Sequence, residues 1–66
     1  MVYEFRFFFS GSEFPARERH AFAGDGEARA RAAGDLLRMP SRRAVTVWCG
    51  DRLVWSRARG AEAPPA

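Results

Sequence analysis

The strongest constraint on the fold of this chain is a hairpin pattern in its second half. Residues 43–49 and 52–57 are rich in β-branched and aromatic side chains, and they flank the dipeptide Gly50-Asp51. A two-residue turn with glycine in the first position is typical of a type II′ β-hairpin. The pattern therefore predicts two antiparallel strands joined by a tight turn.

The predicted pairing gives this hairpin two chemically different sides. The first side carries three opposed pairs: Val45 with Ser56, Val47 with Val54, and Cys49 with Arg52. The second side carries four: Trp48 with Leu53, Thr46 with Trp55, Ala44 with Arg57, and Arg42 with Arg59. The valines mark the first side as the one that packs against a helix. We expect the second side, which holds both tryptophans, to face outward.

The beginning of the chain predicts a second pair of strands. Residues 2–9 alternate with period two, so that Tyr3 and Phe5 share one face with the phenylalanines at 7 and 9. Glu4, Arg6 and Phe8 lie on the other face, which can extend the tryptophan side of the hairpin. The turn signal at 10–12 predicts a returning strand that continues to residue 22 and is irregular near the proline at 15.

One helix is expected between these two pairs of strands. Asp25 precedes a run of helix-forming residues at 27–39, and Pro40 ends it, so Asp25 is the predicted N-cap. At 100° per residue the alanines and leucines of this run form one broad apolar arc. The opposite stripe is predicted to be solvent-exposed and consists of Glu27, Arg31, Gly34, Asp35 and Arg38.

The length of the chain limits it to one domain. A chain of 66 residues buries only about 60% of its unfolded surface. We expect an α+β domain over residues 1–59 with the element order ββαββ, and a flexible tail over residues 60–66. A strand order of 2-1-3-4 makes the sheet wholly antiparallel. A single helix covers only one face of such a sheet.

The same order of elements resembles a known group of proteins. The strand, turn, strand, Ala/Arg-rich helix and Val-x-Val-Trp-x-Gly-Asp-Arg-Leu-Val hairpin is similar to short bacterial proteins of high-GC genomes that have no assigned activity. The matching pieces are residues 3–9, 20–22, 25–37 and 45–54. The resemblance implies a ββαββ fold and a stand-alone chain, and it transfers no site residues.

Catalytic, metal and cofactor sites find little support in the sequence. The single histidine, His20, and the single cysteine, Cys49, do not form a ligand pair at any zinc spacing. Gly24-Asp25-Gly26 is too short for a phosphate-binding loop. There is no apolar run of about 18 residues and no secretory signal. We therefore expect a cytoplasmic protein that is not an enzyme and that needs no cofactor and no metal.

The side of the hairpin that carries both tryptophans is the feature that most indicates a binding function. An exposed patch of Trp48, Leu53, Trp55 and Phe8 is one that monomers usually avoid unless it binds something. We expect a homo-oligomer or another protein partner on this patch, with two sheets packed face to face or joined edge to edge.

Two alternative interpretations remain open. All eleven basic residues are arginines, and the net charge is +3. In the first alternative, the tryptophans stack on single-stranded nucleic acid while Arg42, Arg57, Arg59 and Arg6 contact phosphates. In the second, the two sides of the hairpin are reversed, and the tryptophans belong to the core under the helix.

Overall fold

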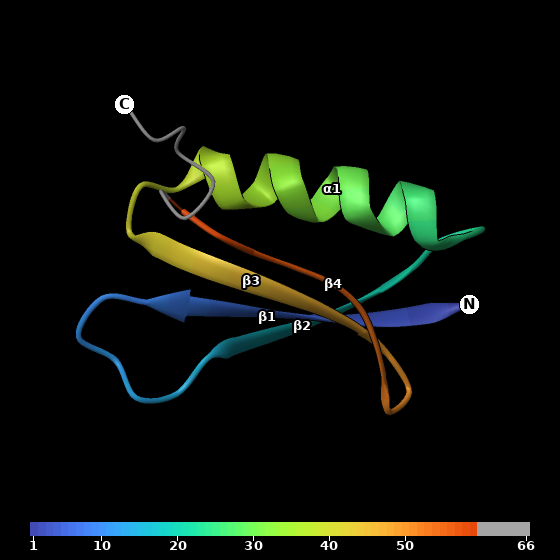
Figure 1. Cartoon of the computed structure of the whole chain (residues 1–66), viewed down its shortest axis with the longest axis horizontal. Coiled ribbons are helices and arrows are strands. Elements are labelled where there is room, and N and C mark those ends of the chain that lie inside the picture. The colour runs from blue at the N-terminus through green and yellow to red at the C-terminus, as the bar shows by residue number, and fades with distance from the viewer. Residues whose placement is uncertain (60–66) are drawn as a thin grey trace.

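The computed structural model describes residues 1–59 and shows the predicted α+β fold (Figure 1). Its elements follow the order ββαββ: β1 (Val2–Phe9), β2 (Ala16–Ala21), α1 (Asp25–Arg38), β3 (Arg42–Cys49) and β4 (Arg52–Ala58). The strands form one antiparallel sheet in the order β2-β1-β3-β4, which confirms the predicted topology. The predicted tail at 60–66 lies outside the described residues.

The core lies between the helix and the two central strands. The buried side chains of β1 are Tyr3, Phe5 and Phe7, and those of β3 are Val45 and Val47. The helix contributes two alanines and one leucine, namely Ala28, Ala32 and Leu36. Large side chains therefore come from the sheet and small ones from the helix, which lets the helix approach the sheet closely. The predicted inward face of β1 and the valine side of β3 are confirmed.

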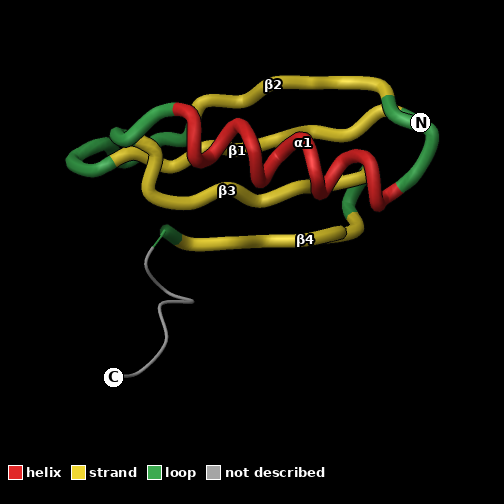
Figure 2. Tube along the Cα trace, turned by 90° about the horizontal axis from the view of Figure 1, so that it is seen from above, coloured by secondary structure: helices red, strands yellow, loops and turns green. Residues whose placement is uncertain are grey.

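The helix covers the sheet unevenly. Figure 2 shows α1 running above β1 and β3, with β2 outside it on one side and β4 on the other. The opposite face of the sheet carries no element among residues 1–59 (Figure 1). The described residues thus form two layers, and none of their helices or strands covers the face of the sheet opposite α1.

The helix begins two residues earlier than predicted, and the predicted cap is wrong. Gly24 is the N-cap residue, and no side chain caps it. Asp25 is the first helical residue, and its carboxylate binds groups of the sheet instead, as described below. Asp35 also departs from its predicted exposed position, because it is only 5% exposed.

The β3–β4 hairpin departs from the predicted register after two pairs. Gly50 adopts a φ of 64° while no described non-glycine residue has a positive φ, as a type II′ turn requires. Cys49 lies opposite Arg52 and Trp48 opposite Leu53, as predicted. The register then shifts, so that Trp55 lies opposite Val47 rather than Thr46.

The shift has a simple structural cause, a β-bulge in which Val54 is the extra residue of β4. Side chains of a strand alternate between faces, so one inserted residue moves everything after it to the other face. Trp55 consequently packs against the core, and Arg57 lies opposite the buried Val45. The reversed interpretation is thus correct for Trp55 and wrong for Trp48.

Candidate interaction face

The face of the sheet that points away from α1 is the candidate site, and we call it the open face. Its residues follow from the register of the strands: Val2, Glu4, Arg6 and Phe8 of β1, Arg17, Arg19 and Ala21 of β2, Ala44, Thr46 and Trp48 of β3, and Leu53, Ser56 and Ala58 of β4. Three large apolar side chains on it are solvent-exposed. Val2 is 60% exposed, Leu53 50% and Phe8 37%.

Trp48 and Arg6 form the centre of the open face. The guanidinium of Arg6 lies over the indole of Trp48, 4.9 Å from the ring centroid, which is a cation–π geometry. Arg6 also donates to the carboxylate of Glu4 at 2.6 Å, and Arg19 lies 3.7 Å from the other oxygen of that carboxylate. The indole Nε1 donates to Thr46 at 3.1 Å. The polar groups at the centre therefore have partners within the same chain.

Glu4 responds electrostatically to this arrangement. The hydrogen bond from Arg6 and the nearby positive charges of Arg17 and Arg19 lower the pKa of the Glu4 carboxyl below its ordinary value, although partial burial opposes them. The ionised form of Glu4 is therefore favoured, and it accepts the hydrogen bond from Arg6 beside the tryptophan.

The open face divides into two strips that run along the strands. The strip on β1 and β2 carries Glu4 and the three arginines, and we call it the basic strip. The strip on β3 and β4 is uncharged and consists of Ala44, Thr46, Trp48, Leu53, Ser56 and Ala58. Near the hairpin turn, Val2, Glu4, Arg19 and Gly50 line a depression of about 250 Å³.

Four of the predicted site residues lie on the open face and four do not. Trp48, Leu53, Phe8 and Arg6 occupy it as predicted. Trp55 and Arg57 are turned to the core side by the bulge. Arg42 and Arg59 bind the end of the helix, so the predicted cluster of outward arginines at the open end of the hairpin is wrong.

The two arginines at the helix C-terminus have well-defined partners. Arg42 donates to the carbonyl of Asp35 at 2.5 Å, and its guanidinium lies 4.0 Å from the ring centroid of the buried Phe7. Arg59 donates to the carbonyl oxygens of Leu36 and Met39. The last carbonyls of a helix lack partners within it and carry partial negative charge. Both side chains therefore stabilise the fold and are withdrawn from an external ligand.

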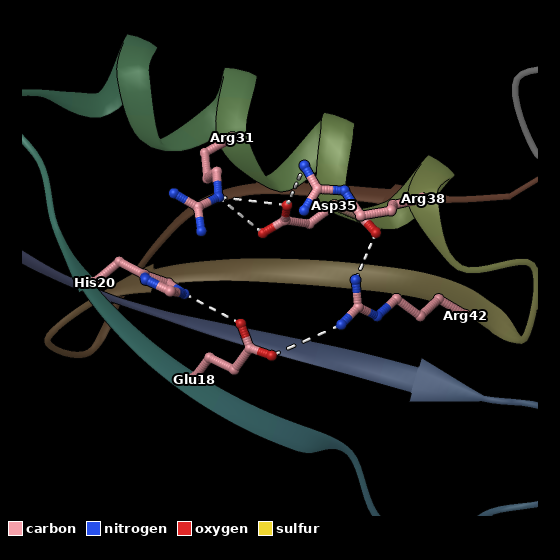
Figure 3. Close-up of polar contacts among 6 residues, drawn as sticks. All are labelled: Glu18, His20, Arg31, Asp35, Arg38 and Arg42. Carbon is pink, nitrogen blue, oxygen red and sulfur yellow. Dashed lines mark hydrogen bonds and ion pairs between the residues drawn. The ribbon is translucent and has the colours of Figure 1, made fainter.

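A second polar cluster lies on the helix side of the sheet, beside β2 (Figure 3). The ligand atoms of Glu18, His20 and Asp35 lie within 4.8 Å of one another, a spacing that a metal ion can use. Arginines already occupy both carboxylates, however. Arg31 binds Asp35 at 3.1 Å, and Arg42 lies 3.7 Å from Glu18.

This cluster has a structural explanation. The helix does not extend over β2, and the charged side chains close that side of the core around Phe5 and Phe22. Several guanidinium groups beside the two carboxylates oppose a bound cation electrostatically. The sequence did not reveal the cluster, because Asp35 meets Glu18 only when β2 is placed beside β1.

A third polar contact joins the hairpin turn to the helix N-terminus. The hydroxyl of Tyr3 donates to Asp25 at 2.6 Å, and Arg52 binds the same carboxylate at 3.1 Å. The hydrogen bond to Asp25 and the burial of the ring raise the pKa of Tyr3 to about 12. The hydrogen bonds from Arg52 and Tyr3 lower the pKa of Asp25. The half-buried thiol of Cys49 lies next to this contact, opposite Arg52.

Comparison of the chain with family models, with curated proteins and with solved structures found no match. Among the described residues, no helix has the length and apolar character needed to cross a membrane. Function is therefore inferred from the geometry of the open face.

Proposed function

We propose that this chain is a non-enzymatic interaction module that associates with a second copy of itself through the open face. The observation that carries the proposal is the exposure of Val2, Phe8 and Leu53 around the Trp48–Arg6 stack on a sheet face that the helix leaves uncovered. Large apolar side chains exposed on one face and bordered by polar residues are typical of interaction sites. Aromatic side chains and arginine are the residues enriched in the centre of protein interfaces.

Both edges of the sheet carry features that oppose the addition of another strand. The edge strand β2 is short, and its middle residues Arg17, Glu18 and Arg19 are charged. The edge strand β4 carries the Val54 bulge, with an arginine at 52 and another at 57. Charges, short strands and bulges are the devices that block edge pairing. Face-to-face association is therefore favoured over an edge-to-edge extension of the sheet.

The charges at the centre of the open face are compatible with burial in an interface. Glu4 binds Arg6 and lies near Arg19 within one chain. Buried charges are costly unless they are paired and hydrogen-bonded. Because these pairs form before association, their removal from water leaves fewer groups without partners.

Single-stranded nucleic acid is the second candidate for the open face. It is favoured by one observation, the presence of Arg6, Arg17 and Arg19 against the single carboxylate of Glu4. The stacking surface is already occupied, however, since Arg6 covers Trp48. Arg42 and Arg59, which would extend the basic surface, bind helix carbonyls instead. Self-association therefore accounts for more of the geometry.

A matched pair of leucine substitutions tests the proposal. Leu53 lies on the open face, whereas Leu37 lies on the helix and is exposed to a similar degree, 62%. Burying a leucine side chain contributes about 1.5–3 kcal/mol, so Leu53→Ser should weaken a dimer by about tenfold or more. Leu37→Ser should leave it unchanged. Light scattering over a concentration series measures both.

The same experiment separates the two candidates. A parent protein that stays monomeric at every concentration would contradict self-association. Binding of a short single-stranded oligonucleotide to that monomer, weakening steeply with added salt, would support the second candidate. A dimer that Leu53→Ser and Leu37→Ser weaken equally would contradict the assignment of the interface to the open face.

A further inference from the structure

The division of the open face into two strips restricts how two copies can face each other. This inference rests on the proposed self-association. Two identical sheets that pack face to face are related by a two-fold axis lying in the plane between them. For aligned packing, in which strand directions agree within about 30°, the axis runs either across the strands or along them.

An axis across the strands brings like charges together. It places each strand over the same strand of the partner, so that β2 lies over β2 and β1 over β1. The Arg17 and Arg19 side chains of both copies then meet at one side of the interface. Like charges opposite each other destabilise a sheet pairing, and the uncharged strips of both copies lie too far away to relieve them.

An axis along the strands gives the opposite result. It exchanges the two sides of the sheet, so that β2 of one copy lies over β4 of the partner and β1 lies over β3. Residues in one cross-strand row stay in that row. The row of Arg19, Glu4, Trp48 and Leu53 therefore faces itself in reverse order, with Arg19 over the partner's Leu53.

We propose that this protein forms a two-fold dimer whose axis runs parallel to the strands between β1 and β3, so that the basic strip of each copy covers the uncharged strip of the other. In this arrangement the Trp48 side chains of both copies lie beside the axis, at the centre of the interface. Arg17 lies opposite the partner's Ser56, because Arg17, Arg6, Thr46 and Ser56 form the next row. The aliphatic stem of Arg19 then covers the partner's Leu53, while its charged end reaches the rim.

Chemical crosslinking between two single-cysteine substitutions tests the axis. Arg17→Cys and Ser56→Cys alter exposed side chains on opposite edge strands. The native Cys49 is retained, and the parent protein treated in the same way is the control. Each variant is treated alone with a short bifunctional maleimide, and then the two variants are mixed in equal amounts, allowed to exchange subunits and treated again.

The axis along the strands predicts crosslinked dimers only in the mixture. Facing sheets are about 10 Å apart, whereas β2 and β4 are separated laterally by three strand spacings, about 14 Å. Two copies of the same variant therefore hold their new thiols out of reach of each other. Two results would overturn this axis and leave self-association standing. One is crosslinking of either variant by itself above the level of the parent protein. The other is a mixture that gives no crosslink while light scattering shows a dimer. A monomer in light scattering would overturn both.

Discussion

The two tryptophans of the β3–β4 hairpin show how differently the two faces of the sheet are used. Trp48 lies on the open face, where Arg6 covers its ring. Trp55, opposite Val47, packs against the core beneath the helix. Both residues are partly buried tryptophans on neighbouring strands, and they lie on opposite faces of the sheet because of one extra residue. The position of a bulge therefore decides how much aromatic surface this protein presents to a partner.

The two faces of the sheet also differ in how far the side chains of β1 are buried. On the inner face, Tyr3, Phe5 and Phe7 are fully buried against the helix alanines. On the open face of the same strand, Val2 is 60% exposed and Phe8 37%. The inner face stabilises the domain, and the open face is available for association.

The largest expected effect is a loss of folding stability when a side chain on the helix-facing side of β1 is truncated. Phe5→Ala removes a buried ring from the centre of the core and should cost about 3–5 kcal/mol. The single core of a chain of 66 residues supplies only about 3–5 kcal/mol, so this variant should be mostly or partly unfolded at ambient temperature. Phe8→Ala, on the open face of the same strand, should destabilise the monomer clearly less, because the Phe8 ring is already 37% exposed and leaves no cavity inside the core. Chemical denaturation at low protein concentration measures both, and equal losses would contradict the assignment of faces.

A smaller effect concerns the inner face alone and depends on pH. Tyr3 is the single tyrosine of the chain, and its pKa is raised to about 12 by Asp25 and by burial. Because the folded pKa is above the unfolded value, this contact stabilises the fold fully below about pH 10 and is lost as the pH rises towards 12. Asp25 has a lowered pKa, so its contribution is present above about pH 4 and is lost on acidification.

Ultraviolet titration of tyrosinate measures this contact directly. In the parent protein Tyr3 should ionise near pH 12, and in Asp25→Ala its pKa should fall towards the ordinary value. Asp51→Ala, a substitution of an exposed turn residue, is the matched control and should leave the titration unchanged. An ordinary tyrosine titration in the folded parent would show that the hydroxyl does not bind Asp25.

The sequence was sufficient to predict the fold because its signals were local. Alternation in residues 2–9, the Gly50-Asp51 turn and the helix stop at Pro40 each depend on neighbouring residues only. Together they predicted the element order and the strand order that the structure shows. The pairing nearest the turn, Trp48 with Leu53, was also predicted correctly.

The wrong predictions concern residues whose positions depend on contacts with distant parts of the chain. Nothing in the run Leu53-Val54-Trp55 marks Val54 as a bulge, since all three residues favour strands. Asp35 is buried because Arg31 and Arg38 accompany it and β2 lies nearby. Arg59 binds carbonyls of a helix more than twenty residues earlier in the chain. Half of the predicted site residues consequently lie on the open face, and the two arginines that β2 contributes to the basic strip were missed.

The most direct test of the account uses the two tryptophans as separate reporters. Trp55→Phe leaves Trp48 as the only tryptophan, and Trp48→Phe leaves Trp55. On dilution from dimer to monomer, the emission of Trp48 should shift to longer wavelength as the open face meets water. The emission of Trp55 should stay constant, because Trp55 packs against the core on the other face of the sheet. Two results would contradict self-association through the open face. One is a constant emission of Trp48 over a dilution in which light scattering shows that the dimer dissociates. The other is a shift in the emission of Trp55 alone.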